Sequence, residues 1–531
     1  MPKKHRPKRK SKAAAPNNPF ANLPLDEDAI FALLSQVLPR SFQPSEEKGA
    51  LELFTEYLEG RARGEAPDDE ESALIVELID ALNELRIDSN GGDRQARETT
   101  GLILGRLNSA IEDGALTPVD LIMTGKILGD AGWTVPDQLK TAIADAMLTA
   151  APGGKDEDEG DIATLLTELP ESIGTNPFDI HEFVKPLLAA LPPEASCHLL
   201  SALAATRAPG MQHALAGFLL HEEDLVARAA AEVIRASTAD APVESLLIER
   251  LVHMRPWLPP ARQPLLDSAL KALRTRAQPP KTQEVPKLVA GHVSIRDGSG
   301  TSSLCVGQRQ GAHYQFASVL MKSTGVAEVM IIPDLSKAAM NDLLSQLTSS
   351  VPTMKTGLPG LLRTLRLALA DNSSSATLPP FRLIEFVESL GVPPLHPDHT
   401  SAANLLAELL ADLPPGQTNP SAVARAHAEI LDEELTEHWF EAGETVERLL
   451  QPLKGHKRRV GALLNTYLPQ RRAFWARQCA LSAFAMRGNA DAPWKQLALV
   501  GRDIASDMPL DRIPLMEQIA EMSVTAFEMQ M

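Results

Sequence analysis

The sequence predicts a mainly α-helical, multi-domain protein that is interrupted by one small α+β module. Of its 531 residues 44% are hydrophobic and 4% aromatic, so Leu and Ala must do most of the packing, as in stacked helices. Apolar residues recur at helical spacing on both sides of residues 292–334. Residues 292–334 are instead β-branched, alternating and punctuated by glycine, which is typical of strands and hairpins. The length leaves room for roughly three to four domains.

The N-terminal quarter predicts a basic tail followed by a helical domain. Residues 1–25 hold seven Lys or Arg and no acid, and such a segment buries too little apolar surface to order itself. An N-terminal helical domain is predicted over 26–152, in which Thr117-Pro118 has the pattern of a helix start. Residues 153–163 are rich in Gly and acids and predict an acidic linker.

Residues 164–278 alternate helical segments of about a dozen residues with short Pro, Gly or polar breaks. The stretch 221-HEEDLVARAAAEVIRAS-237 places Asp224 and Arg228 around Val226, followed by small residues and an aliphatic pair. This pattern resembles the second helix of a HEAT-type repeat, and the resemblance covers about residues 190–275. It implies a HEAT-like helical repeat region in which an Asp and an Arg lie between neighbouring repeats.

The stretch that contains the expected strands follows a Pro-rich linker at 279–290. A module at 291–348 is predicted as a three- to four-stranded meander with strands at 293–295, 303–308, 313–321 and 326–332. Asp334 or Ser336 is expected to cap a helix that covers one sheet face. The sequence Asp297-Gly-Ser-Gly300 predicts a hairpin turn, because a strand and not a helix follows it and no lysine completes a phosphate loop. If the module has a function, we expect it at a strand edge.

Helix returns after the module. Residues 349–380 predict a helix and a Ser/Pro linker, and residues 381–531 predict a C-terminal helical domain with a basic patch. Within that domain Asn419-Pro420 predicts the start of a long helix that continues to about His438.

The charge distribution provides the candidate binding residues. The net charge is −18, yet residues 448–490 hold nine Lys or Arg and no acid, as the N-terminal tail also holds none. Cations neutralise phosphates and aromatic rings stack on unpaired bases. The candidate polyanion-binding residues are Lys3, Lys4, Arg6, Lys8, Arg9, Lys10, Lys454, Lys457, Arg458, Arg459, Arg471, Arg472, Trp475 and Arg477. The alternative is that the arginines pair with the acidic body while Phe474 and Trp475 belong to the core.

Other sequence features argue against several classes of protein. No apolar run approaches the roughly 18–20 residues that cross a bilayer, and no apolar segment follows the basic N-terminus as in a signal peptide. Cys197, Cys305 and Cys479 lie far apart, which favours a reducing, cytoplasmic location, buried thiols and no disulfide. His396 and His399 lie in a proline-rich stretch, and Glu434 and His438 lack the Glu-x-x-His spacing. We therefore expect no metal and no cofactor.

The function expected from these features is that of a non-catalytic intracellular scaffold or adaptor, which binds protein partners through helical-repeat surfaces. No catalytic motif is present, so enzymatic activity is not expected. The alternative is a nucleic-acid or ribonucleoprotein binder that uses the basic tail and the 454–477 patch. A remote alternative, a HEAT-like enzyme of the DNA glycosylase type, rests on analogy of fold alone. No membrane partner is expected.

Overall fold

The structure is a computed structural model, and it describes most of the chain from residue 49 onward. The described ranges are 49–63, 69–91, 93–149, 174–237, 243–279, 285–414, 416–433, 436, 438–489 and 491–529. The predicted basic tail, the predicted acidic linker at 153–163 and the start of the predicted N-terminal helical domain, residues 26–48, therefore lie outside the described residues. Among the described helices none is both long and apolar enough to cross a membrane.

The fold is mainly helical and multi-domain, with one antiparallel sheet, as the sequence predicts. The N-terminal helices are α2 (Ala50–Ala62), α3 (Asp69–Gly91), α4 (Arg94–Glu112), α5 (Pro118–Asp130) and α6 (Asp137–Thr149). The helix start at Pro118 is confirmed. Thr117 accepts a hydrogen bond from the Asp120 backbone, and the Asp120 side chain accepts one from the Thr117 backbone. This reciprocal capping satisfies two donors that the first turn of a helix otherwise leaves unpaired.

A series of helix pairs follows. These helices are α8 (Pro177–Ala189), α9 (Pro193–Thr206), α10 (Met211–Ala216), α11 (Asp224–Ser237), α12 (Ser245–Met254) and α13 (Gln263–Arg274), with 3₁₀ turns at Gly217–Leu220 and Arg255–Trp257. Helix α10 contacts both α8 and α12, and α11 contacts both α9 and α13. The pairs α8–α9, α10–α11 and α12–α13 therefore stack in order, the arrangement by which paired helices bury faces that one pair leaves open.

Helix α8 also packs on α5. A Cβ on Gly125 would lie 2.5 Å from the Ala190 Cβ, and one on Gly129 would lie 3.0 Å from the Pro186 Cβ. Glycine at these two positions, one turn apart, lets the α5 backbone approach α8 this closely. The apolar core is accordingly continuous from α2 to α11.

An ion pair joins consecutive helix pairs of the stack. Arg262, at the start of α13, donates from Nε to the Asp224 carboxylate of α11 at 2.6 Å. The same guanidinium donates to the carbonyl groups of His221 and Glu222. The HEAT-type pattern named Asp224 and Arg228, and the arginine that pairs with Asp224 here is Arg262 of the next helix pair.

The sheet has five strands in the order β4-β3-β2-β1-β5, and every pairing is antiparallel. The strands are β1 (Lys287–Ser294), β2 (Ser302–Gln310), β3 (His313–Lys322), β4 (Gly325–Leu335) and β5 (Thr353–Lys355). The predicted meander is correct for β2, β3 and β4. Strand β1 begins inside the predicted Pro-rich linker, and β5 was not predicted, because three residues are too few to show an alternating pattern.

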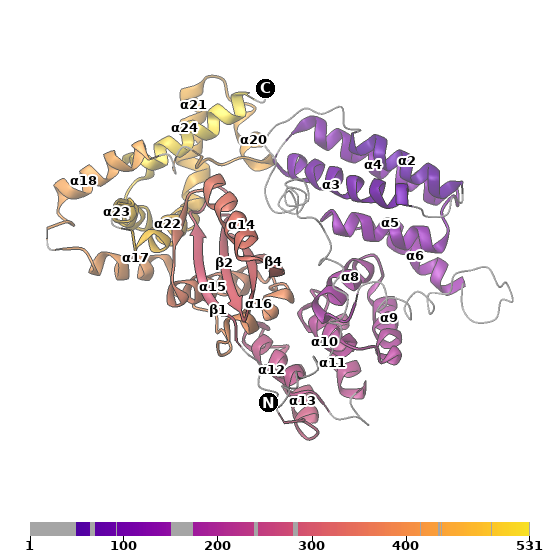
Figure 1. Ribbon diagram of the computed structural model, residues 1–531. Helices are drawn as coiled ribbons and strands as arrows, with labels where there is room; N and C mark the ends of the chain where they lie inside the picture. Colours follow the sequence, from indigo (N-terminus) through magenta and orange to yellow (C-terminus); the bar gives the residue numbers. More distant parts are fainter. Residues whose placement is uncertain are drawn as a thin grey trace, which may run out of the picture. The chain divides into compact units, whose positions relative to one another are not determined.

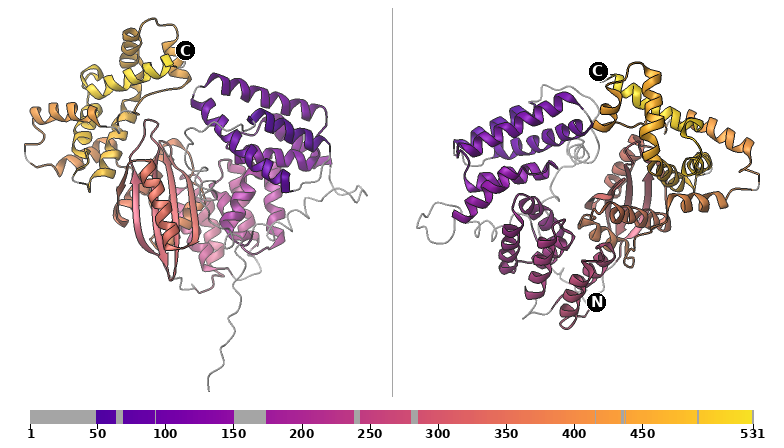
Figure 2. Two further views of the ribbon diagram at one scale, coloured as in Figure 1. Left: turned by 45° about the horizontal axis from the view of Figure 1, so that its top comes forward. Right: turned by 180° about the vertical axis from the view of Figure 1, so that it is seen from behind.

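Helices cover both faces of the sheet (Figures 1 and 2). They are α14 (Lys337–Ser350), α15 (Leu358–Ser375) and α16 (Arg382–Leu390). Ser336 caps α14, as one of the two predicted caps, and a Cβ on Gly307 would lie 2.8 Å from the Met340 sulfur of that helix. Leu304 and Val306 alternate with Gly307 and pack into the core shared with α15 and α16 on the opposite face.

The C-terminal region is helical throughout its described length apart from connecting turns. Its helices are α17 (Ala402–Ala411), α18 (Pro420–Glu429), α20 (Glu444–Leu450), α21 (His456–Ala462), α22 (Leu468–Met486), α23 (Trp494–Ala505) and α24 (Pro514–Met529), with 3₁₀ turns at Ile430–Asp432 and Leu510–Arg512 and a π-helical turn at Leu463–Tyr467. Asn419 caps α18 as predicted, but the predicted extension to about His438 is wrong. The helix ends at Glu429, and Thr436 instead donates its hydroxyl to the Ile430 carbonyl.

Helix α16 attaches the sheet to the helix stack. Arg250 of α12 donates to both Glu388 carboxylate oxygens of α16, at 2.7 and 3.0 Å. Arg382 of α16 donates to Asp179 of α8 at 2.6 Å. Trp257 donates its indole N–H to the Leu395 carbonyl at 2.9 Å. Bidentate arginine–carboxylate pairs are strong and geometrically specific. The Arg250–Glu388 pair therefore holds α16 in a defined position against α12.

Candidate functional site

The predicted polyanion-binding residues divide into three groups in the structure. The N-terminal cations Lys3, Lys4, Arg6, Lys8, Arg9 and Lys10 lie outside the described residues. In the C-terminal zone Lys454, Lys457 and Arg458 are exposed at the start of α21. The remaining candidates of that zone are at least partly buried and have internal partners.

Arg459 follows the exposed cations directly but is buried. Its guanidinium donates to the Glu528 carboxylate of α24 at 2.7 Å and to the Leu453 carbonyl at 3.1 Å. It also lies over the Phe527 ring, 5.0 Å from the centroid. Arg459 thus holds α21 against α24.

Arg471 and Trp475 share a buried acceptor, Glu441. The Glu441 Oε1 accepts from Arg471 Nε at 2.8 Å and from Trp475 Nε1 at 2.9 Å. Its Oε2 accepts from the Tyr467 hydroxyl at 3.1 Å, and burial together with the Glu441 charge raises the pKa of Tyr467 to about 12. Trp475 is fully buried, so its ring face is not available to stack on a base.

Arg472 and Arg477 also bind within the chain. Arg472 donates to the carbonyls of Ile504 at 2.9 Å, Met508 at 2.8 Å and Ser506, and these groups lie at the end of α23, where a helix leaves carbonyls unpaired. Arg477 forms an ion pair with Asp371 of α15 at 2.6 Å. The structure therefore brings Arg459, Arg471, Arg472 and Arg477 into the protein's own packing, and leaves Lys454, Lys457 and Arg458 facing outward.

The Asp297–Gly300 turn joins the sheet to the C-terminal helices. Asp297 Oδ1 accepts from the backbone N–H groups of Ser299 and Thr301, both at 2.9 Å, which closes the turn locally. Gly300 has φ +87°, a conformation that favours glycine. A Cβ on Gly298 would lie 2.5 Å from the His438 carbonyl oxygen. The predicted turn is confirmed, and its glycines permit a close backbone contact.

Two hydrogen bonds and a charge cluster fix this contact. Gln478 of α22 donates to the Asp297 carbonyl at 2.9 Å, and Trp439 donates to the Arg296 carbonyl at 3.1 Å. The buried Arg296 guanidinium lies 3.9 Å from Asp371, and burial lowers the pKa of Arg296 to about 10. Sequence reasoning missed Asp371, because an Asp inside a leucine-rich helix carries no local signal of its distant partners.

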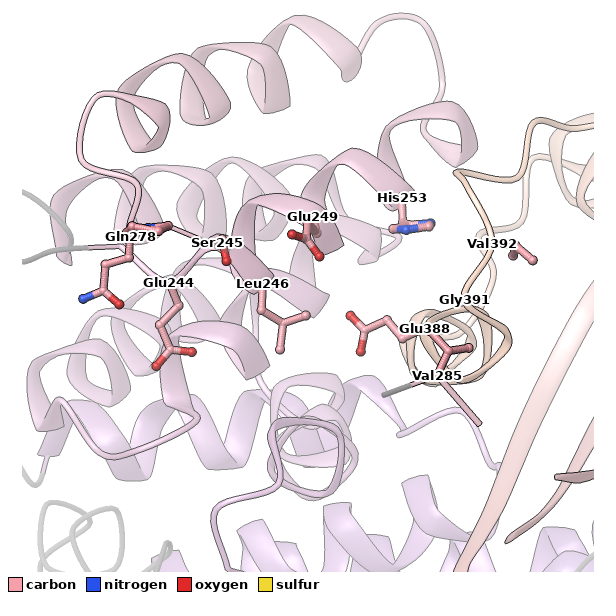
Figure 3. Close-up of a pocket in the computed structure, with 11 residues that line it drawn as sticks. Glu244, Ser245, Leu246, Glu249, His253, Gln278, Val285, Glu388, Gly391 and Val392 are labelled. Carbon is pink, nitrogen blue, oxygen red and sulfur yellow. The ribbon is translucent and has the colours of Figure 1, made fainter. Parts of the chain in front are cut away.

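A groove lies between α12 and α16, with a volume of about 380 Å³ (Figure 3). The residues that line it are Glu244, Ser245, Leu246, Glu249, His253, Gln278, Pro279, Val285, Glu388, Gly391 and Val392. Glu388 points from α16 toward α12. The His253 Nδ1 is buried without a hydrogen-bond partner, and burial lowers the pKa of this imidazole. None of these residues was singled out from the sequence.

Burial raises the pKa of all three cysteine thiols. Burial raises the pKa of the Cys305 thiol to about 11 and that of Cys479 to about 12, which disfavours the reactive thiolate. Both are buried, as predicted, whereas the prediction is wrong for Cys197, which is partly exposed on α9. All three are free thiols.

Comparisons with known proteins point to two of the helical regions. Residues 192–277, which include α9 to α13, match the family model described as the Y4lR second domain. Residues 403–528 match the model described as the Y4lR C-terminal helical domain. Neither description names a HEAT repeat. No curated protein and no solved structure matches the chain. The protein is therefore similar to Y4lR proteins in its second-domain helix stack and in its C-terminal helices.

Proposed function

We propose that this protein is a non-catalytic scaffold or adaptor that binds protein partners through its helix stack. The proposal rests on one observation, the ordered stacking of the helix pairs α8–α9, α10–α11 and α12–α13. The ion pair between Asp224 of α11 and Arg262 at the start of α13 connects the second of these pairs to the third. Stacked helical pairs present extended surfaces that other macromolecules bind. The HEAT-type sequence pattern around Asp224 supports the same proposal, and three free thiols are consistent with a cytoplasmic location.

The internal use of the basic zone adds support. Arg459, Arg471, Arg472 and Arg477 stabilise contacts between helices of the protein. Because the guanidinium groups of these arginines are bound to internal partners, they contribute little to an outward binding surface. A protein whose cations hold its own helices together fits a scaffold better than a polyanion binder.

The test uses the full-length chain as bait, with and without nuclease. A scaffold retains specific protein partners after nuclease treatment, and a partner purified on its own re-forms a complex of defined stoichiometry. Paired substitutions of exposed residues on the stack, such as Leu225→Ser with Arg228→Glu on α11, should weaken one or more complexes while the helical circular dichroism stays unchanged. If every partner is lost with nuclease, the scaffold proposal is wrong.

A second candidate function is nucleic-acid binding, and the exposure of Lys454, Lys457 and Arg458 at the start of α21 favours it. Three contacts to phosphates would make the affinity fall steeply with salt. Binding to RNA and to DNA should be compared between the full chain, its triple Lys454→Gln, Lys457→Gln, Arg458→Gln variant and a chain without residues 1–12. The scaffold proposal expects no retention on either nucleic acid at low salt. The glycosylase-type alternative would release bases from alkylated DNA, and we expect no release.

A further inference from the structure

A separate groove, with a volume of about 390 Å³, lies between α12 and α13, the last helix pair of the stack (Figure 1). All the residues that line it belong to the continuously described range 243–279. On α13, Asp267, Lys271 and Arg274 follow one another at intervals of four and three residues, so their side chains share one face of the helix. The residues that line the groove are Val252, Arg255, Asp267, Leu270, Lys271 and Arg274.

The side chains of this groove carry more positive than negative charge. Arg255 donates to both carboxylate oxygens of Asp267, at 2.6 and 2.8 Å, so these two groups neutralise each other. The hydrogen bond from Arg255 is the main cause that lowers the pKa of Asp267, and the charge of Arg274 contributes, which places Arg274 close to this pair. Lys271 and Arg274 are exposed, and neither forms an ion pair with a residue that the structure describes. Two cations are therefore left without a counter-charge.

Lys271 and Arg274 also lie in the last turn of α13, where cations interact favourably with the helix dipole. The dipole favours a cation on any side of the helix and does not select one flank. Both cations lie on the flank that lines the groove, beside the half-buried Val252 and the buried Leu270. The effect of the dipole alone therefore does not explain why the charges gather at the groove.

These properties favour an acidic segment of a protein as the occupant. A Glu side chain has aliphatic carbons that fit against Val252 and a carboxylate that Lys271 and Arg274 can bind. A polyphosphate backbone would also bring phosphates against Asp267, which repels them. The net charge of the chain is −18, so general electrostatic attraction favours basic ligands, and an acidic ligand has to be selected by a local site.

We propose that the groove between α12 and α13 binds an acidic segment of a partner protein, with a Glu or Asp carboxylate between Lys271 and Arg274. The proposal rests on the scaffold function and names the chemistry of one partner. Arg255 and Asp267 hold each other in place through their bidentate pair, which leaves the two unpaired cations to the ligand.

The probe is a tetramethylrhodamine-labelled peptide in which Glu alternates with Val and Ala, and fluorescence anisotropy with the full-length protein measures its dissociation constant. Lys271→Gln with Arg274→Gln should weaken binding by about threefold to twentyfold, since two favourable charge contacts are lost. Lys271→Arg with Arg274→Lys keeps both charges and should bind within about twofold of the natural protein. A peptide with Gln in place of each Glu should not bind. Failure of the Glu peptide to bind the natural protein would overturn the proposal.

The matched control replaces two exposed cations of the sheet module, Lys322→Gln with Lys337→Gln. It changes the net charge equally and should leave the dissociation constant within about twofold. Equal weakening by both double variants would mean that the total charge controls binding, and would overturn the proposal. So would a Lys271→Gln, Arg274→Gln variant that is less stable in urea but binds the peptide as tightly as the natural protein, because the two cations would then act on the helix dipole alone.

The same assay distinguishes two other occupants. An RNA oligonucleotide that binds more tightly than the acidic peptide, and loses this affinity in the Lys271→Gln, Arg274→Gln variant, would make the occupant a nucleic acid. Peptide binding that appears only after the acids of residues 156–161 are replaced by their amides would make it the chain's own acidic segment. Either result overturns the proposal of a partner protein.

The scaffold function and the groove fail separately. A purified partner that binds the full chain and the Lys271→Gln, Arg274→Gln variant equally well overturns the groove as its docking site while the scaffold stands. Specific peptide binding without any nuclease-resistant partner overturns the scaffold and leaves the groove established as a site for acidic segments.

Discussion

Asp371 of α15 and Arg477 of α22 form an ion pair, with 2.6 Å between Oδ1 and Nη2. The other carboxylate oxygen of Asp371 lies 3.9 Å from the Arg296 guanidinium. One carboxylate therefore faces two arginines, from the sheet module and from the C-terminal helices, at the place where these two regions meet. Desolvation outweighs both arginines and raises the pKa of Asp371.

Asp371→Asn should destabilise the protein by about 2–4 kcal/mol, because it leaves two largely buried guanidinium groups without their counter-charge. The measurement is the midpoint of urea unfolding, followed by tryptophan fluorescence. The control is Asp412→Asn, which removes the exposed partner of Arg487 and should cost less than about 1 kcal/mol. Equal losses of unfolding free energy in the two variants would contradict the prediction that the buried Asp371 ion pairs stabilise the protein more than an exposed pair does.

Gly298→Ala should push the Asp297–Gly300 turn away from residues 438–440, since the added Cβ would lie 2.5 Å from the His438 carbonyl oxygen. The expected loss is about 1–3 kcal/mol, together with a red shift of the emission of Trp439, which now donates to Arg296 from a fully buried position. Gly105→Ala on α4, where a Cβ meets open space, should be neutral or stabilising by up to about 1 kcal/mol. An unshifted spectrum in Gly298→Ala would contradict the close contact.

Arg262 should matter more than its partner Asp224. The Asp224 side chain is 68% exposed, so Asp224→Asn removes a solvated charge contact and should cost less than about 1 kcal/mol. Arg262→Leu also removes the donors to the His221 and Glu222 carbonyls and should cost about 1–3 kcal/mol. Urea unfolding of the two variants and their combination tests this order; the reverse order would mean that the ion pair alone joins the helix pairs.

Acid should destabilise the helix stack through buried histidines. His181 lies between Phe218 and Phe381, and burial, the main cause, lowers its pKa to about 3. Its neutral ring stabilises the fold fully above the ordinary pKa of about 6.5. As pH falls from 6.5 toward 3 the unfolded chain takes up a proton that the folded chain does not. The free energy of unfolding should then drop by about 1.4 kcal/mol per pH unit.

The check on this pH dependence is urea unfolding at several pH values between 7 and about 4, a window chosen to lie between the two pKa values. His181→Gln should have a shallower decline than the natural protein, although it is less stable at pH 7. The exposed His198 offers the control, and His198→Gln should keep the natural slope. A His181→Gln slope equal to the natural one would place the acid sensitivity elsewhere.

Local patterns were sufficient to predict most of the elements. The Thr117-Pro118 helix start, the Ser336 and Asn419 caps and the strands β2 to β4 depend on a few neighbouring residues, which the sequence shows directly. The errors have local causes too. Ser373, Ser374 and Ser375 predict a linker, but each donates its hydroxyl to a carbonyl four residues earlier and stays within α15. The helix after Asn419 ends at Glu429, and the residues that follow place Trp439 where its indole donates to the distant Arg296 carbonyl.

The exposure of the candidate binding residues, in contrast, could not be predicted from local patterns. Lys457 and Arg459 are two residues apart in one basic run, yet one is exposed and the other is buried on Glu528. Charge counting cannot separate them, because the partner is 69 residues away. The same holds for Arg471 with Glu441 and for Arg477 with Asp371, and the groove between α12 and α16 is formed by segments that no local pattern relates.

The sequence by itself determined the helical class, the strand-bearing module and the turn at Asp297–Gly300, because helix periodicity, strand alternation and glycine conformation are properties of adjacent residues. The tertiary structure decided which charges are internal and which face outward. It did so because an arginine is held inside the protein by a carboxylate or carbonyl from a distant segment, and the packing of the helices selects that partner. The carboxylates of Glu441, Asp371 and Glu528 therefore determine which arginines of the basic zone are held inside the protein: Arg471, Arg477 and Arg459.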